Sequence, residues 1–154
     1  MHEEKALNAL PDLSQASAFM RASGLQLTEV GPERVVGYLD LGPEHHTPWG
    51  MVHGGVYTTA IESAASVGAS VAVADRGQIA VGVNNTTDFL RSAAAGRAQV
   101  TAAPIYQGRT QQLWQVEIRR DSDGALLARG QVRLQNVEPR PATTNPVVHP
   151  SSVP

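Results

Sequence analysis

The second half of the chain shows a regular alternation of hydrophobic and polar residues. Between residues 110 and 119, for example, Trp114, Val116 and Ile118 alternate with polar neighbours. A period of two is typical of antiparallel strands that bury one face and expose the other. Turn-forming residues at 107–109 and 121–124 are placed to join consecutive strands as hairpins. The pattern predicts four strands here, over residues 79–85, 97–106, 110–119 and 126–135.

A long stretch almost without charge precedes these strands. Residues 54–74 contain no proline and a single formal charge, on Glu62, and they are followed by the helix-stop sequence Asp75-Arg76-Gly77. We therefore expect one long helix, buried on nearly all sides because so little of it is charged. Upstream, the sequence predicts a short helix over 11–21, capped by Asp12 or Ser14, and two strands over 25–30 and 34–41.

Together these elements predict an α+β fold in which one long helix packs inside a curved antiparallel sheet. We expect a flexible N-terminus over residues 1–14 and one folded domain over residues 15–136. The last segment, 137–154, holds five of the ten prolines and little that could form a core. We expect it to be a disordered tail without a function of its own.

Composition narrows the classes of function. The 154 residues include no cysteine, which excludes disulfides, a thiol nucleophile and cysteine zinc sites. The net charge of −2 and the seven scattered aromatic residues argue against nucleic-acid binding. No apolar run approaches the roughly 18 residues of a membrane span, and the acidic start is unlike a signal peptide, so we expect a cytoplasmic protein. The five histidines are not grouped with carboxylates at ligand spacing, so no metal site is expected.

The single charge of the predicted helix is the first candidate for chemistry. Burying an unpaired carboxylate costs several kcal/mol, so Glu62 needs either a partner or a function. Helical spacing places Thr58 before it and Ser66 after it on the same stripe. Two interpretations stay open from the residues alone. Glu62 is either a structural carboxylate satisfied by hydroxyls or by an arginine, or a reactive one.

The start of the predicted helix is the second candidate. The segment Trp49-Gly-Met-Val-His-Gly-Gly places His53 and two glycines where a loop becomes the helix. Amides at a helix N-terminus suit the binding of an oxyanion, and glycines let a ligand approach. The alternative is that the glycines only form a tight bend and that His53 is a core residue. A buried carboxylate nine residues later favours an active site.

These residues carry a resemblance to a known family. The segment Trp49-Gly-Met-Val-His-Gly-Gly-Val-Tyr, followed by Glu62-Ser-Ala-Ala-Ser66, resembles the hotdog-fold acyl-CoA thioesterases. The most similar branch is the phenylacetate-pathway-related group with Arthrobacter-type 4-hydroxybenzoyl-CoA thioesterase and 1,4-dihydroxy-2-naphthoyl-CoA thioesterases. Residues 81–92 and 106–118 fit as well, and the resemblance covers about residues 15–136. It implies a hotdog fold that forms a homodimer or a dimer of dimers, with the active site at the subunit interface.

The resemblance also implies roles for the candidate residues. The reaction would be hydrolysis of an acyl-CoA thioester with an aryl or short-to-medium acyl group, and no cofactor, since CoA is part of the substrate. Glu62 would be the catalytic carboxylate, which attacks the thioester carbonyl or activates water. Gly54 and Gly55 would supply the amide that polarises the carbonyl, with His53 beside them. Ser66 would hold the water or the carboxylate. Glu62 and Ser66 would face His53 and Gly54 of the partner chain.

The remaining implied contacts are with the thioester and with CoA. Related enzymes often carry a glutamine six residues before the histidine, but Thr47 stands there, so the usual amide partner of the thioester or the carboxylate is missing. The forked guanidinium of Arg109 suits phosphate, although Arg109 is equally consistent with a solvated turn residue. For Arg91, phosphate binding is favoured over the alternative of a structural salt bridge. The implied substrate-contacting residues are Thr47, Gly82, Asn85, Phe89, Leu90, Arg91, Ser92, Tyr106, Gly108, Arg109, Thr110 and Gln111.

Two other functions stay open. One is a non-catalytic hotdog module that binds acyl-CoA; Glu62 argues against it, while the missing glutamine leaves it possible. The other is a hotdog hydratase or dehydratase that acts on acyl thioesters. Such enzymes pair a histidine with an acidic residue in a different motif, which this sequence lacks.

Overall fold

The structure is a computed structural model, and it describes residues 16–140. The predictions for residues 1–14, the caps Asp12 and Ser14, and the part of the tail after residue 140 lie outside the described residues. Within 16–140, no helix has the length and apolar character needed to cross a lipid bilayer.

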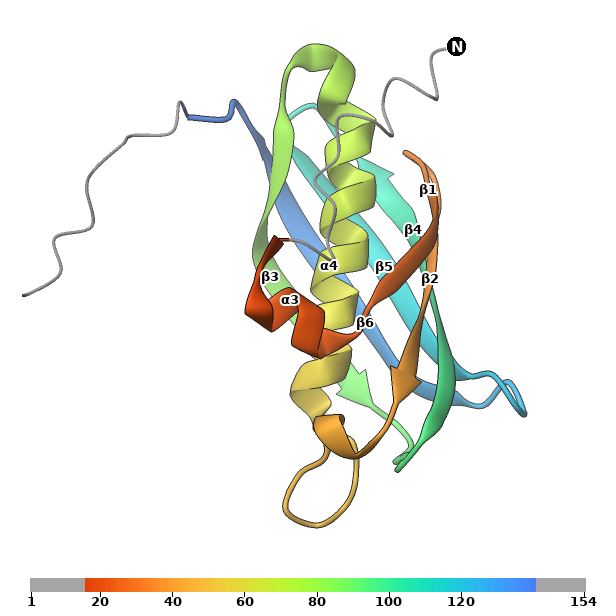
Figure 1. Cartoon of the computed structure of the whole chain (residues 1–154). Helices are drawn as coiled ribbons and strands as arrows, with labels where there is room; N and C mark the ends of the chain where they lie inside the picture. The colour runs from red at the N-terminus through yellow and green to blue at the C-terminus, as the bar shows by residue number, and fades with distance from the viewer. Residues whose placement is uncertain (1–15, 141–154) are drawn as a thin grey trace, which may run out of the picture.

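One long helix and a six-stranded antiparallel sheet make up the fold, as the sequence predicts. The strands follow the order β1-β2-β4-β5-β6-β3, so β1 and β3 are the end strands. Figure 1 shows α4 lying along the sheet and α3 crossing α4 on the side that faces away from the sheet. The elements are α3 (Ala18–Ser23), β1 (Gln26–Val30), β2 (Val35–Leu41), the 3-10 turn η1 (Pro43–His45), α4 (Gly54–Val73), the 3-10 turn η2 (Ala74–Arg76), β3 (Ile79–Phe89), β4 (Gly96–Gln107), β5 (Gln111–Arg120) and β6 (Leu126–Val137).

Most predicted boundaries lie within two residues of the observed ones, and two of those that differ concern the first helix and β3. The start of the helix predicted over 11–21 lies outside the described residues, but its end does not: α3, capped by the Ser17 hydroxyl that accepts from the Met20 N–H, continues to Ser23 and is followed by Gly24 with a φ of 75°. The strand β3 continues to Phe89 rather than ending at Asn85, because its polar second half keeps pairing with β6. Asn84, Asn85 and Asp88 are of types that are depleted in strands, so the composition concealed the extension.

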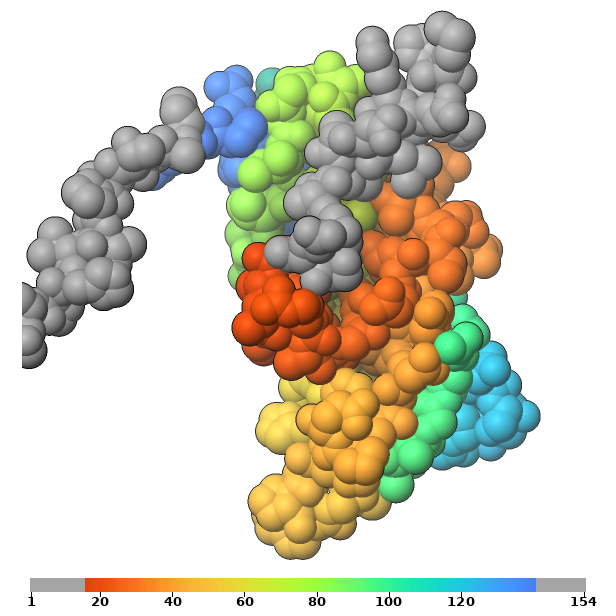
Figure 2. Space-filling view, in the orientation of Figure 1, coloured from red at the N-terminus to blue at the C-terminus, as the bar shows by residue number. Residues whose placement is uncertain are grey.

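The core lies between α4 and the concave face of the sheet. The helix approaches the sheet closely at Gly68, where a Cβ atom would lie 2.5 Å from the Trp114 ring. The other side of α4 is only partly covered, by α3, and Thr59, Glu62 and Ser66 are half-buried. Within one chain, therefore, α4 is buried on the side that faces the sheet and half-buried on the other side. Figure 2 shows α3 in red on the molecular surface, above the orange segment around η1.

A buried polar network ties α4 to the far end of the sheet. The Gln112 amide donates to the Ala69 carbonyl at 2.9 Å and to Asn136 Oδ1 at 2.8 Å, and it accepts from Trp114 Nε1 at 2.9 Å. Asn136 in turn donates to the carbonyls of Gly108 and Arg109, each at 3.1 Å. The network therefore fixes the turn between β4 and β5 against the helix.

Candidate active site

Glu62 extends from the middle of α4 toward the end strand β3. Its Oε2 accepts a hydrogen bond of 3.0 Å from Asn85 Nδ2. Its Oε1 lies directly over Gly82, where a Cβ atom would be only 2.0 Å away. Among residues 16–140 neither a hydroxyl nor an arginine bonds this carboxylate; its side-chain partner is the amide of Asn85. The Glu62 carboxylate fits here because position 82 has no side chain.

The first turn of α4 presents one free backbone amide. The Gly55 N–H donates to His53 Nδ1 at 2.8 Å, and the Val56 N–H donates to the His53 carbonyl at 3.0 Å. The Gly54 N–H has no acceptor among the described residues. The Phe89 ring covers Gly54, since a Cβ atom there would lie 3.0 Å from Phe89 Cε1. Of the two glycines, Gly54 is the one whose amide can still polarise a ligand.

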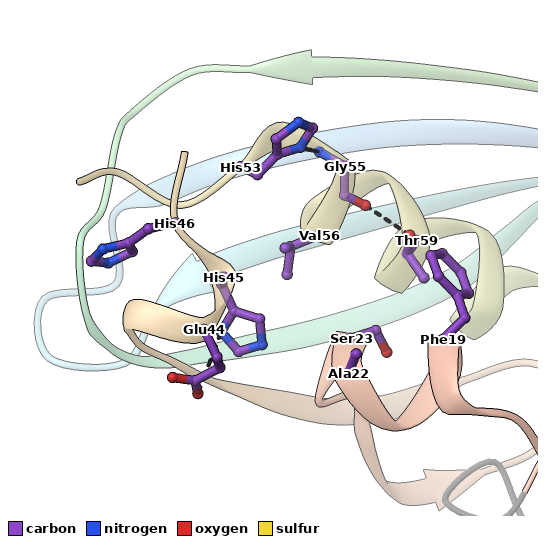
Figure 3. A pocket seen from close by; sticks show the side chains of 10 residues that line it. All are labelled: Phe19, Ala22, Ser23, Glu44, His45, His46, His53, Gly55, Val56 and Thr59. Carbon is purple, nitrogen blue, oxygen red and sulfur yellow. Dashed lines mark hydrogen bonds and ion pairs between the residues drawn. The ribbon is translucent and has the colours of Figure 1, made fainter. Parts of the chain in front are cut away.

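A cavity of about 390 Å³ opens beside this helix terminus, between α3, η1 and the first turns of α4 (Figure 3). The imidazole of His45 is buried in its wall, and Thr59 Oγ1 donates to the Gly55 carbonyl at 2.7 Å. Phe19, Ala22 and Val56 supply the apolar part of the wall, against which an apolar group can pack. The lining residues are Phe19, Ala22, Ser23, Glu44, His45, His46, His53, Gly55, Val56 and Thr59.

The carboxylate and the free amide do not meet within one chain. Glu62 follows Gly54 by eight positions, which corresponds to about 12 Å along an α-helix. That distance is too long for both groups to contact one carbonyl. Ser66, one turn beyond Glu62, has no side-chain hydrogen bond among residues 16–140. Nor does this part of the chain contain a group of three or more His, Asp or Glu residues that could hold a metal ion.

Comparison with known proteins identifies the family. Residues 50–127, which include the free amide and Glu62, match the family model of the thioesterase superfamily. Rv1847 of Mycobacterium tuberculosis is 50% identical over 120 residues, 77% of this chain and 85% of that protein. Its solved structure has a TM-score of 0.76 and covers 81% of this chain and 100% of its own. The chain belongs to the thioesterase superfamily.

More distant thioesterases agree with this assignment. The 1,4-dihydroxy-2-naphthoyl-CoA hydrolase of Listeria monocytogenes is 30% identical over 103 residues, 67% of this chain and 83% of that protein. The solved structure of thioesterase HI1161 from Haemophilus influenzae is 26% identical, with a TM-score of 0.74 and coverage of 81% of this chain and 85% of its own. The predicted hotdog fold and the predicted class, a thioester hydrolase, are both confirmed.

In this thioesterase the predicted CoA-contacting residues fall at opposite ends of α4. Phe89 lies against Gly54 at the N-terminal end, with Leu90, Arg91 and Ser92 following it. The group from Tyr106 to Gln111 lies at the other end, where the Arg109 carbonyl accepts from Arg76 Nη1 at 3.4 Å. Within one chain, therefore, the structure does not bring the two groups together around one nucleotide.

Two further predicted residues have roles that the sequence does not indicate. Thr47 Oγ1 accepts a hydrogen bond from the Trp49 N–H at 3.3 Å, so this side chain is used within its own loop. Asn85, expected among the CoA contacts, instead bonds the Glu62 carboxylate. No spacing rule relates positions on a helix and a separate strand, so the contact becomes visible only once α4 and β3 are packed together.

Proposed function

We propose that this thioesterase hydrolyses an acyl-CoA thioester with Glu62 as its catalytic carboxylate. The observation that carries the proposal is a half-buried carboxylate held over Gly82 by a neutral amide, with no cation beside it among residues 16–140. Such a carboxylate attacks the thioester carbonyl or takes a proton from an attacking water. In either case water is consumed, the C–S bond breaks, and the acid and the CoA thiol leave. The carboxylate, the helix-terminal amide and water suffice, so no cofactor is required.

The active site needs two copies of the chain. Because Glu62 and Gly54 lie about 12 Å apart along one helix, the carbonyl that Glu62 attacks takes its polarising amide from the Gly54 of a second copy. The end strand β3 supports this arrangement, since Ile79, Val81 and Val83 on it are 40%, 40% and 56% exposed. Pairing two copies along this edge covers those side chains and closes the sheet edge. A dimer, or a dimer of dimers, is the expected assembly.

The substrate follows from the cavity and its surroundings. The space beside Gly55 takes an aryl or short-to-medium acyl group, in line with the aromatic acyl-CoA that names the Listeria relative. Arg91 and Arg109 are the candidate contacts for the CoA phosphates. Because their two groups lie at opposite ends of α4, one nucleotide would have to contact them on different chains.

The test begins with Glu62→Gln, which keeps the volume of the side chain and removes its charge. We expect turnover to fall by about 10²–10⁴-fold, with folding and acyl-CoA binding retained, because an amide neither attacks nor accepts a proton. Release of thiol from a panel of acyl-CoAs measures turnover, and the absorbance of enoyl-CoAs reports a hydratase. Near wild-type turnover would reject Glu62 as the catalytic carboxylate. Retained binding without thiol release by the wild-type protein would favour the binding module.

Hybrid dimers then test whether the site is shared. Gly54→Pro removes the free N–H at a position where helices accept proline, and His53 already has the extended conformation, φ −65° and ψ 133°, that precedes proline. A tag-purified hybrid of Gly54→Pro with Glu62→Gln has one intact shared site, so about half of the wild-type activity should return. The matched control carries both changes in one chain and none in the other, and should be inactive. A site contained within one chain would give the reverse result.

A further inference from the structure

A β-bulge in β3 turns two residues toward the helix. Gly82 pairs with Leu134 and Asn85 pairs with Val132, both of which are buried on the inner face of β6. The register shifts between Gly82 and Asn84, so Val83 is the extra residue. In a regular strand, positions 82 and 85 would point to opposite faces. Because of the bulge, the space over Gly82 and the side-chain amide of Asn85 lie on the same side of the sheet.

The surroundings of Asn85 fix the orientation of its amide. Its Nδ2 donates to Glu62 Oε2 at 3.0 Å and to the Thr58 carbonyl at 3.4 Å, and both of these groups can only accept. Its Oδ1 accepts from Thr87 Oγ1 at 2.7 Å. Turning the amide over would set its oxygen against a carboxylate and a carbonyl. Thr87 and Thr58 thus hold the NH₂ group toward Glu62.

We propose that Asn85 is the positioning residue of the catalytic carboxylate, an inference that rests on the proposed function of Glu62. A single neutral donor fixes one oxygen and leaves the charge of the carboxylate in place for attack or proton transfer. An arginine, by contrast, would hold both oxygens through its fork of donors. Thr47 carries no amide, and among residues 16–140 Asn85 is the side-chain amide that donates to Glu62.

The experiment compares Asn85→Ala with Asn84→Ala, an adjacent position on the bulged strand. Hydrogen bonds to charged groups are strong, so Asn85→Ala should lower kcat by about 10- to 100-fold with little change in KM. Asn85→Asp, of equal size, should lower kcat further because it places a carboxylate against Glu62. Asn84 is exposed, and its Oδ1 accepts from Thr86 Oγ1 rather than contacting Glu62. Asn84→Ala should therefore keep the wild-type kcat.

The split between kcat and KM separates positioning from CoA binding. Loss of positioning lowers kcat equally for acyl-CoA and for acyl-pantetheine, which lacks the nucleotide. A higher KM for acyl-CoA alone, with kcat unchanged, would overturn the proposal. Thr87→Val removes the orienting hydroxyl at nearly constant volume and should lower kcat several-fold; it decides the question if Asn85→Ala does not fold. If Glu62→Gln stays active, the proposed function of Glu62 is rejected. If Glu62→Gln is inactive but Asn85→Ala has a normal kcat, only the positioning role of Asn85 is rejected.

Discussion

Two polar clusters pack an amide side chain against α4, and they differ in how completely they are paired. Gln112 is 1% exposed, and both ends of its amide are bonded to protein groups. Asn85 is likewise bonded at both ends, but its partner is the half-buried carboxylate of Glu62, which has one side-chain donor among residues 16–140. A closed neutral network specifies packing, whereas a charged group with spare acceptor capacity is available to a substrate.

Two glycines on α4 and β3 show the same difference between a structural cluster and a candidate reactive one. Gly68 leaves space for the Trp114 ring, and Gly82 leaves space for the Glu62 carboxylate. In each case a Cβ atom would come within 2.5 Å of its neighbour. The neighbour of Gly68 is part of the core, so a side chain there would disturb packing. The neighbour of Gly82 is the candidate reactive group, so a side chain there would disturb chemistry. Substitutions in the two clusters should accordingly separate turnover from stability.

Gly82→Ala should lower turnover more than Gln112→Leu or Tyr57→Phe. The new methyl group would lie 2.0 Å from Glu62 Oε1, so the carboxylate has to move. A displacement of about 1 Å can cost on the order of 10²-fold in rate, and we expect a loss of that size in kcat. Thermal unfolding should change little, since alanine within a strand is at least as favourable as glycine. Gly31→Ala, whose Cβ would make an ordinary 3.5 Å contact, is the matched control. Full activity of Gly82→Ala would show that this position of the carboxylate is not required.

Gln112→Leu should produce the opposite result. Leucine leaves the Trp114 indole N–H, Asn136 Oδ1 and the Ala69 carbonyl without their bond to Gln112. An unpaired buried group costs about 1–3 kcal/mol. We expect the free energy of unfolding to fall by about that amount, while kcat well below the melting temperature stays normal. Urea unfolding at one fixed protein concentration measures the change. Gln131→Leu, at an exposed position, serves as the control. A loss of kcat in Gln112→Leu would show that the Gln112 cluster also contributes to turnover.

Periodicity was sufficient to predict the fold because most elements bury one face only. The alternation around Trp114 and the uncharged stretch around Glu62 gave the strands and the long helix. The same reasoning ended β3 too early, because the pairing of its polar second half with β6 depends on tertiary contacts rather than on composition. A bulge is equally hidden, since nothing in the residue type of Val83 marks it as the extra residue of the pair.

The candidate site was predictable only where it lies on one element. Glu62 and Gly54 are both on α4, and their chemistry can be read from the helix alone. Asn85 lies 23 residues after Glu62 in the sequence and reaches it only because β3 packs against α4. The free amide of Gly54 could be separated from that of Gly55 only after the His53 ring was placed. Contacts between elements therefore account for what the sequence did not predict.

Tyr57→Phe should have the smallest effect and completes the contrast between paired and unpaired groups. The Tyr57 hydroxyl is buried and has no hydrogen-bond partner among residues 16–140. Burial raises the pKa of Tyr57, with Arg120 acting in the opposite direction. Removing an unpaired hydroxyl should leave the free energy of unfolding at pH 7 unchanged or raise it by up to about 1 kcal/mol.

The pH dependence gives Tyr57→Phe a second readout. A raised pKa in the folded state means that the folded protein retains the phenolic proton more strongly than the unfolded chain. The stability from this group is thus constant below the unfolded pKa of about 10 and is lost as pH rises through it. The wild-type protein should lose more stability than Tyr57→Phe between pH 9 and about pH 11, measured by urea unfolding. The other tyrosines are the same in both proteins and cancel in the comparison. A variant clearly less stable at pH 7 would show that the hydroxyl is paired in solution, and Tyr57 would then belong with Gln112 among the closed structural contacts.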